Sequence, residues 1–262
     1  MELVVVLKWR WYLLLISLHS QAYAQDTCST LSISGDMTWY PYSLFNQSGD
    51  LKGLIAEITY RVFSELGVKV SVEPPVPWKR QLKKLEYGQL DAITGMYYTP
   101  ERAKIYLFPQ PIAQDAMHVF VASERNFTFN SWEDLKDKTG ALPSGAGIAT
   151  SAEFDKYARQ HLDILGATDT EQMLHMLSAA RVDYVVASYA DGMYYLSQMG
   201  LTNKIEVKPT PIIVNNVYLA FSKRSRCAAM IEVFNEKYRQ LLEDNTLKGL
   251  YLKYHSLPPP EP

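Results

Sequence analysis

The chain has 262 residues, of which 47% are hydrophobic and 21% charged, and its formal net charge is −2. These proportions are typical of a folded globule, and the length is sufficient for one large core or two modest ones. A charge so close to neutral argues against a nucleic-acid partner, which would call for a basic stripe, so we expect none.

Residues 1–24 have the pattern of a secretory signal peptide. Lys8 and Arg10 precede a short apolar run, and Ala22 and Ala24 are the small residues that a signal peptidase reads. The apolar run is shorter than a membrane span requires. We therefore expect cleavage after Ala24 and a periplasmic location; an uncleaved anchor or a buried apolar start is the alternative.

The sequence contains two cysteines, Cys28 and Cys227. In an oxidising compartment an even pair predicts one disulfide, which here would join the start of the mature chain to a late helix. Two unpaired buried thiols are the alternative.

Strands and helices alternate in the first half of the sequence. Apolar and polar residues alternate over 31–34 and 68–72, as in half-buried strands. Between them, apolar residues recur every fourth place over 51–66, which predicts a core-facing helix. A second helix is expected over 78–88 and a further strand over 90–93. This order predicts a parallel sheet with helices on both faces.

The same alternation starts again in the second half. We expect strands at 138–142, 182–187, 205–208 and 214–221, and helices at 151–165, 170–181, 188–199, 226–242 and 247–254. Two α/β units in a chain of this length predict two lobes, with a ligand at the carboxyl ends of the strands. The proline-rich segment 257–262 is expected to be a disordered tail.

A series of short motifs resembles a known family. In chain order the motifs are Gly35-Asp36, Trp39-Tyr40-Pro41-Tyr42, 53–58, Trp78, Gly88-Gln89-Leu90-Asp91-Ala92, Thr99-Pro100-Glu101-Arg102, Phe108-Pro109, Trp132-Glu133-Asp134-Leu135-Lys136 and Ala180-Arg181-Val182-Asp183. Their order and spacing resemble those of the family 3 extracellular solute-binding proteins, the polar amino acid receptors of ABC importers. The resemblance covers nearly the whole mature chain.

The resemblance implies an α/β, two-lobed periplasmic binding protein of type II. Each lobe would be a mostly parallel sheet flanked by helices, and two crossover strands would act as the hinge. Lobe 1 would comprise residues 25–118 and 214–262, and lobe 2 residues 119–213, with crossings near 117–122 and 211–217. The family further implies a monomer that passes a small polar ligand, an amino acid or a related carboxylate, to an inner-membrane ABC permease.

Arg102 is the foremost candidate for ligand binding. Its planar guanidinium can meet a carboxylate with two parallel hydrogen bonds, which Lys cannot do. In the family, the Arg of this motif holds the α-carboxylate of the ligand. Trp39 and Trp78 match positions where relatives present rings, and stacking or cation–π contacts are expected there. Backbone groups or a hydroxyl could come from the segment after the strand at 90–93, namely Thr94, Gly95 and Met96.

Two positions depart from the family's pattern. The Asp that takes the ligand's ammonium in amino acid receptors is Ser188 here, and Asp191 lies one helical turn further on. A Gly-Thr pair at a helix start is replaced by a segment that contains Gly147, whose N–H groups could still bind an anion. The ligand could therefore be an amino acid, a modified amino acid or another small carboxylate. Further carboxylates are expected near the cleft at Asp36 and Asp115, whereas Glu57 better fits a helix surface.

Two other classes of function remain open. The chain could be a stand-alone sensor that reports a ligand to a membrane partner, or a periplasmic dehydratase on the same fold. An enzyme would need an acid or base with a shifted pKa in the cleft. His118, His161 and His175 lie in no motif with a nucleophile, and neither metal-ligand spacing nor a phosphate-binding loop is present. We therefore expect binding without catalysis, no cofactor and no metal.

Overall fold

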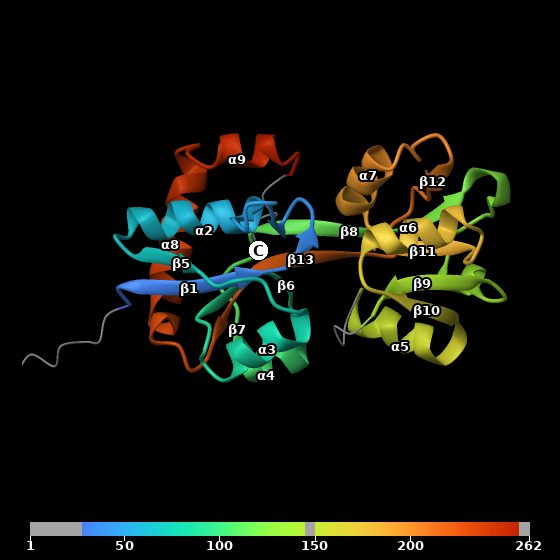
Figure 1. Ribbon diagram of the computed structural model, residues 1–262. Helices are drawn as coiled ribbons and strands as arrows, with labels where there is room; N and C mark the ends of the chain where they lie inside the picture. Colours follow the sequence, from blue (N-terminus) through green and yellow to red (C-terminus); the bar gives the residue numbers. More distant parts are fainter. Residues whose placement is uncertain (1–27, 145–149, 257–262) are drawn as a thin grey trace, which may run out of the picture.

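The computed structural model describes residues 28–144 and 150–256. The predicted signal peptide at 1–24, the segment with Gly147 and the tail at 257–262 lie outside the described residues. Figure 1 shows two halves joined by two long strands, β8 (Ala113–Ala122) and β13 (Ile213–Ser222). The two-lobed α/β architecture expected from the sequence is thus present.

The first half is built on three parallel strands. β1 (Thr30–Gly35) lies between β5 (Lys69–Val72) and β6 (Ala92–Tyr97), and β13 continues the sheet antiparallel to β6. Figure 1 places helices on both faces of this sheet. One face is covered by α2 (Leu54–Glu65) and α8 (Ile231–Glu243), and the other by α3 (Trp78–Glu86) and α4 (Pro100–Ile105).

The second half repeats the arrangement. β9 (Thr139–Pro143) lies between β10 (Asp163–Ala167) and β11 (Tyr184–Ser188), all three parallel, and β11 pairs antiparallel with β8. Its helices are α5 (Ala152–His161), α6 (Thr170–Ser178) and α7 (Tyr189–Gln198). Apolar residues of α6 and α7, among them Leu174 and Leu196, pack with Val185 and Ala187 of β11 in one core.

Short elements complete the fold. They are β2 (Thr38–Trp39), β3 (Ser43–Phe45), β4 (Leu51–Lys52), β7 (Tyr106–Leu107), β12 (Ile205–Val207), α9 (Lys248–Lys253) and the 3-10 helices η1 (Ser123–Arg125), η2 (Trp132–Leu135) and η3 (Arg226–Met230). β2, β3 and β4 form a small antiparallel sheet of their own. None of the helices in the described ranges combines the length and hydrophobicity of a membrane span.

The helix predicted over 151–165 is wrong at its C-terminal end. α5 ends at His161, Leu162 is extended with φ −119° and ψ 146°, and the next residues form β10. β10 pairs with β9 in parallel, from Asp163 opposite Thr139 to Ala167 opposite Pro143. The hydrogen bonds that make this segment a strand come from a partner distant in sequence, so the local spacing of apolar residues could not reveal them.

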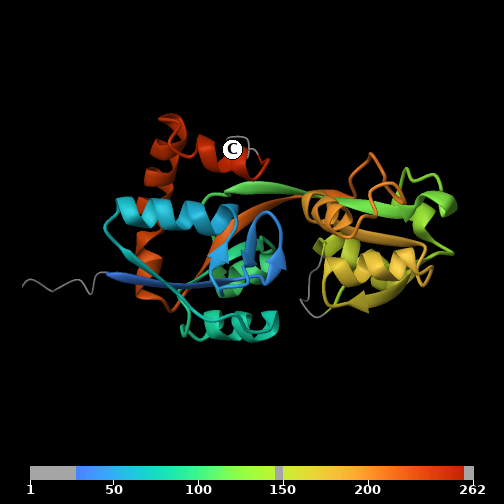
Figure 2. The ribbon, with the colours of Figure 1, turned by 45° about the horizontal axis from the view of Figure 1, so that its top comes forward.

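The two long strands meet at the crossing between the halves. β8 and β13 pair antiparallel over 113–117 and 213–217. Beyond that segment β8 pairs with β11 in the second half, and β13 pairs with β6 in the first. Figure 2 shows both strands passing from one half to the other. The lobe boundaries predicted at 118/119 and 213/214 fall within these strands.

A disulfide joins the two segments of the chain that form the first half. Cys28, which precedes β1, and Cys227 in η3 form a disulfide with a Cα–Cα distance of 4.8 Å, as predicted from the cysteine count. Both cysteines are buried, with 9% and 2% of their surface exposed. The bond fixes the start of the central strand to the segment that leads into α8.

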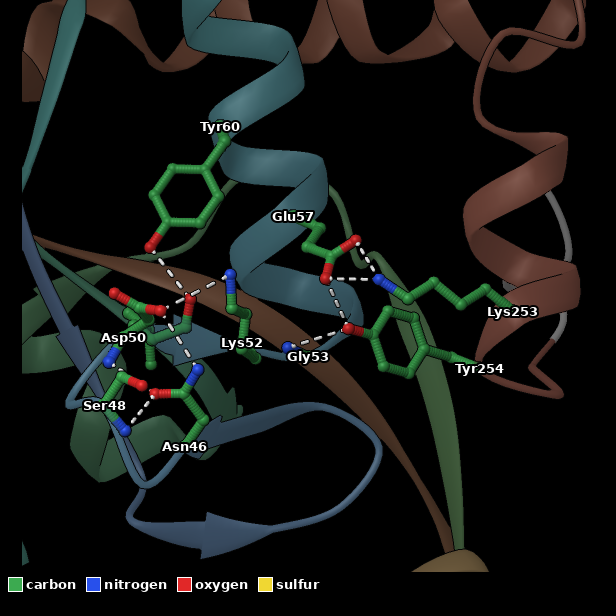
Figure 3. A network of polar contacts seen from close by, with 10 residues as sticks. Asn46, Ser48, Asp50, Lys52, Gly53, Glu57, Tyr60, Lys253 and Tyr254 are labelled. Carbon is green, nitrogen blue, oxygen red and sulfur yellow. Dashed lines mark hydrogen bonds and ion pairs between the residues drawn. The ribbon is translucent and has the colours of Figure 1, made fainter.

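A second tie joins the C-terminal helix to α2 (Figure 3). The carboxylate of Glu57 accepts hydrogen bonds from Lys253 Nζ at 2.7 Å and from the Tyr254 hydroxyl at 2.5 Å. The N–H of Gly53 donates to the same hydroxyl at 3.2 Å. Glu57 therefore ties the residues at the end of α9 to α2 and does not line the space between the halves.

Candidate ligand-binding site

A cavity lies between the two halves. It holds about 870 Å³ of empty space continuous with solvent and is lined by residues of both halves and by Met117 of β8. Asp36 follows β1, Gly95 lies in β6, Pro143 ends β9 and Ser188 ends β11. The carboxyl ends of the parallel strands in both sheets thus meet at one space, which is where α/β sheets bind ligands.

Most of the predicted ligand-binding residues share this cavity. The lining includes Asp36, Trp39, Trp78, Gly95, Met96, Arg102, Ser188 and Asp191. Thr94 does not line it: its buried hydroxyl lies 2.9 Å from Ser43 Oγ and donates to the carbonyl of Ser34 at 3.2 Å. Gly147 lies outside the described residues. The contacts of all ten residues with a ligand stay predictions.

Arg102 provides the positive charge on the first-half wall. Thr99 caps α4 by accepting the Arg102 N–H at 3.1 Å, and Arg102 Nη1 donates to the carbonyl of Tyr97 at 2.9 Å. Burial lowers the pKa of the guanidinium, while Tyr106, Tyr97 and Asp155 act in the opposite direction. An Arg side chain stays protonated in proteins, so the cavity contains a fixed cation.

Asp36 and Asp191 are two of the three carboxylates that line the same cavity, and Asp169 is the third. Asp191, at the start of α7, is only 4% exposed, and burial raises its pKa well above the ordinary value, with Asp36 and Asp115 adding to the rise. Burial also raises the pKa of Asp36, against the effect of the Thr38 N–H, which donates to it at 2.9 Å. Within residues 28–144 and 150–256, neither carboxylate forms an ion pair with a Lys, Arg or His side chain. A cationic group in the cavity would therefore stabilise the ionised form of both carboxylates, which burial disfavours.

Ser188 connects the cavity to the strands between the halves. Its hydroxyl accepts the Asp191 N–H at 3.4 Å at the start of α7 and donates to Asp115 Oδ1 at 2.6 Å. Asp115, on β8, is 1% exposed, and burial raises its pKa to about 6. Sequence reasoning predicts Asp115 only as a further carboxylate near the cleft. An Asp within a strand of mostly apolar residues was the available signal for a special role.

Aromatic rings form one side of the cavity. The Trp39 ring meets the rings of Tyr42 and Tyr97 edge to face, with centroids 5.0 and 5.1 Å apart. Gly95 makes this placement possible: it has φ +94°, and a Cβ there would lie 3.1 Å from Trp39 Cζ3. A side chain at Gly95 would be strained and would press on the indole. Trp78 lines the cavity from the first residue of α3.

The halves also touch each other directly. The N–H of Tyr40 donates to Asp191 Oδ1 at 2.9 Å, and the Tyr195 hydroxyl donates to the carbonyl of Thr38 at 3.3 Å. The Tyr40 ring stacks on Tyr194 with centroids 4.4 Å apart and an interplanar angle of 16°. α7 of the second half therefore rests on the loop around β2, next to the cavity. Sequence reasoning predicted Asp191 as a ligand contact but not this contact between the halves.

Two α/β halves on a pair of crossing strands, with a charged cavity between them, define a two-lobed ligand-binding protein. The chain belongs to the bacterial extracellular solute-binding proteins, family 3, whose model matches residues 31–256. This family is one of binding proteins, which confirms the prediction of a binding protein rather than an enzyme.

Two relatives extend over most of the chain. The L-cystine-binding protein TcyJ of Escherichia coli (strain K12) is 22% identical over 236 residues, which cover 86% of this chain and 82% of the relative. A probable amino-acid ABC transporter-binding protein of Haemophilus influenzae is 24% identical over 236 residues, with 87% and 86% covered.

Solved structures share the fold. A histidine kinase sensor domain with similarity to periplasmic binding proteins has a TM-score of 0.77 at 20% identity and covers 89% of this chain and 100% of its own. An ancestral arginine-binding protein bound to arginine has a TM-score of 0.73 at 24% identity, with 86% and 98% covered. These likenesses confirm the predicted type II periplasmic-binding-protein fold.

Proposed function

We propose that the protein binds an amino acid, or a closely related zwitterion, between its two halves in the periplasm and passes it to an ABC permease of the inner membrane. One observation carries the proposal: a guanidinium from the first half and a buried carboxylate from the second, Arg102 and Asp191, line one cavity. A ligand with a carboxylate and an ammonium complements both groups. The relatives named for cystine binding and amino-acid transport support the same ligand class.

Each charged end of such a ligand has a partner in the cavity. Arg102 is suited to hold the carboxylate through two parallel hydrogen bonds. An ammonium near Asp191 and Ser188 would favour the ionised form of Asp191, whose pKa burial has raised. The rings of Trp39 and Trp78 would cover the apolar part of the ligand or a second cationic group. Because these groups come from both halves, ligand binding would hold the halves together.

The remaining parts of the proposal concern location and assembly. Residues 1–24 would be removed as a signal peptide, which fits a family of extracellular proteins. Lobe 1 would comprise 25–118 and 214–262 and lobe 2 would comprise 119–213, with the protein acting as a monomer.

The test begins with the mature chain from residue 25. Its thermal midpoint would be measured with each amino acid, with L-cystine and with small organic acids, because a ligand that binds the native state alone raises the midpoint. We expect stabilisation by a zwitterionic amino acid and none by its decarboxylated amine. No stabilisation by any amino acid would contradict the proposal.

Variants on α4 then test the carboxylate contact. Arg102→Ala should abolish binding of the amino acid found in the screen, and Arg102→Lys should weaken it at least tenfold, since Lys keeps the charge but not the paired donors. Lys104→Ala changes an exposed cation of the same helix and should bind like the wild type. An Arg102→Ala variant with wild-type affinity would remove Arg102 from the site.

A further inference from the structure

Asp115 occupies a special position at the junction of the halves. It lies in the segment of β8 that pairs with β13, opposite Asn215, and is 1% exposed. A carboxylate buried to this degree requires donors or a cation, because burial disfavours its charged form. Its donors come from both halves of the molecule.

Three hydroxyls converge on the carboxylate. Tyr97 of β6 donates to Oδ2 at 2.5 Å, and Ser188 at the end of β11 donates to Oδ1 at 2.6 Å. The Tyr42 hydroxyl, which donates to the Gln114 carbonyl at 2.8 Å, lies 3.4 Å from Oδ1. Tyr97 and Tyr42 belong to the first half and Ser188 to the second. Tyr97 and Ser188 also line the cavity, so the hydroxyls that hold Asp115 are part of the ligand site.

The charged groups around Asp115 do not neutralise it. On α7 the charged residue is another acid, Asp191. The loop at 40–42 presents the phenol of Tyr42, and β6 presents that of Tyr97. β13 presents Asn215, which is neutral. His118, further along β8, is bonded through Nδ1 to the carbonyl of Lys208. In the part of the chain that the structure describes, no Lys, Arg or His forms an ion pair with Asp115.

We propose that Asp115 is a positioning residue that fixes the hydroxyls of Ser188 and Tyr97 as hydrogen-bond acceptors toward the cavity and thereby makes ligand binding proton-linked. An ionised carboxylate can only accept, so both hydroxyl protons point at it and the free lone pairs are left for other donors. A ligand ammonium is such a donor. Ser188 backed by Asp115 would thus take the place of the Asp that Ser188 replaces.

Protonation of Asp115 would reverse the direction of its hydrogen bonds with these hydroxyls. A neutral Asp115 has a proton to donate, and a hydroxyl that accepts it turns its own proton toward the cavity, where it opposes an ammonium. Burial raises the pKa of Asp115 from 3.8 to about 6, against the lowering effect of Ser188, Tyr97 and Tyr42. Binding of an ammonium should therefore release a proton, and affinity should fall as the pH drops below about 6. With that pKa, about one tenth of the carboxylate is ionised at pH 5, which corresponds to about a tenfold weaker affinity than at pH 8.

The ligand-free protein should show the opposite trend. The pKa of Asp115 is higher in the folded state than in the unfolded chain, so the contribution to stability is present at acidic pH and is lost as the pH rises from about 4 to about 6 and above. Asp191 and Asp36 have raised pKa values too and act in the same direction. Asn cannot ionise, so comparison of the wild type with Asp115→Asn isolates the part of the pH-dependent stability that is due to Asp115.

The test has two arms, and only the first depends on the proposed function. In the first, calorimetry measures the affinity for L-arginine, L-histidine, L-glutamine and L-cystine at pH 5 and pH 8. We expect wild-type affinity for the amino acid that binds to fall about tenfold at pH 5. Asp115→Asn should bind at least tenfold more weakly at pH 8, and its affinity should change about tenfold less than that of the wild type between pH 8 and pH 5, whereas Glu57→Gln, a carboxylate outside the cavity, should match the wild type.

The second arm uses no ligand. The thermal midpoint of the wild type should fall relative to that of Asp115→Asn between pH 5 and pH 8. If Asp115→Asn does not fold, Ser188→Ala replaces it in the calorimetry and should show the same loss of affinity at pH 8. Parallel pH profiles of wild type and Asp115→Asn, or unchanged affinity in Ser188→Ala, would overturn the role of Asp115. Failure of every amino acid in the thermal screen to stabilise the protein would count against the proposed function, and the ligand-free arm would still decide on Asp115.

Discussion

Removal of the Cys28–Cys227 disulfide should destabilise the first half and leave ligand affinity unchanged. The bond joins residues 199 positions apart, so it closes residues 28–227 into one loop. It lies beside the start of β1, whereas Asp36 and the cavity lie just past the end of that strand. The disulfide and the cavity thus lie at opposite ends of β1. Loss of the bond should therefore lower the stability without changing the ligand affinity.

The size of the effect follows from the loop length. The chain-entropy model gives about 5 kcal/mol for a loop of this size, as an upper bound, and loss of a native disulfide typically costs about 2–5 kcal/mol. In chains of about 150–250 residues, each kcal/mol lowers the thermal midpoint by about 2–4 °C. The expected decrease is thus roughly 5–20 °C.

The assay compares the mature wild type with a Cys28→Ser, Cys227→Ser double variant by circular dichroism during heating. Dithiothreitol should lower the midpoint of the wild type toward that of the double variant and leave the double variant unchanged. Calorimetry should give equal ligand affinities for both proteins. A decrease of less than about 2 °C, or an equal response of both proteins to the reductant, would refute the reasoning.

Two further predictions concern packing and the C-terminal helix, and urea unfolding measures both. Gly192→Ala would place a Cβ 2.2 Å from Cζ of Phe120, so it should destabilise by about 1–3 kcal/mol despite the better helix propensity of Ala. Gly249→Ala meets no neighbour within 4 Å and should be neutral or stabilising; equal effects of the two would be inconsistent with this packing. Tyr254→Phe removes a hydroxyl that bonds to α2 and should cost about 1–3 kcal/mol. Lys253→Ala removes the ion pair with Glu57, in which the Lys side chain is 55% exposed, and should cost less than about 1 kcal/mol. A larger loss of stability in Lys253→Ala than in Tyr254→Phe would contradict the greater weight given to the Tyr254 hydroxyl.

Features fixed by local periodicity could be predicted from the sequence. The alternation around Ile33 and the four-residue spacing from Leu54 onward correspond to β1 and α2. The two cysteines form the predicted disulfide. Eight of the ten predicted site residues line the cavity because the loops after parallel strands converge at one edge of each sheet.

Features fixed by distant partners could not be predicted. β10 is a strand because β9 supplies its hydrogen bonds. Thr94 follows the pattern of a ligand-facing loop, but the observed β6 continues to Tyr97 and turns the Thr94 hydroxyl toward Ser43 and Ser34.

Contacts between the halves were beyond sequence reasoning for the same reason. The bond between Asp191 and the Tyr40 N–H joins residues 151 positions apart, and that between Ser188 and Asp115 joins residues 73 apart. No local pattern encodes such pairs. They appear only once the two halves are placed on the crossing strands.

The most direct test of an interlobe ligand site is a crystal structure of the mature protein with the amino acid found in the thermal screen. We predict the ligand in the cavity between the halves, with its carboxylate about 2.7–3.0 Å from the guanidinium nitrogens of Arg102 and its ammonium near Ser188 and Asp191. A ligand bound elsewhere, or an Arg102 guanidinium directed into solvent away from the ligand, would contradict the site.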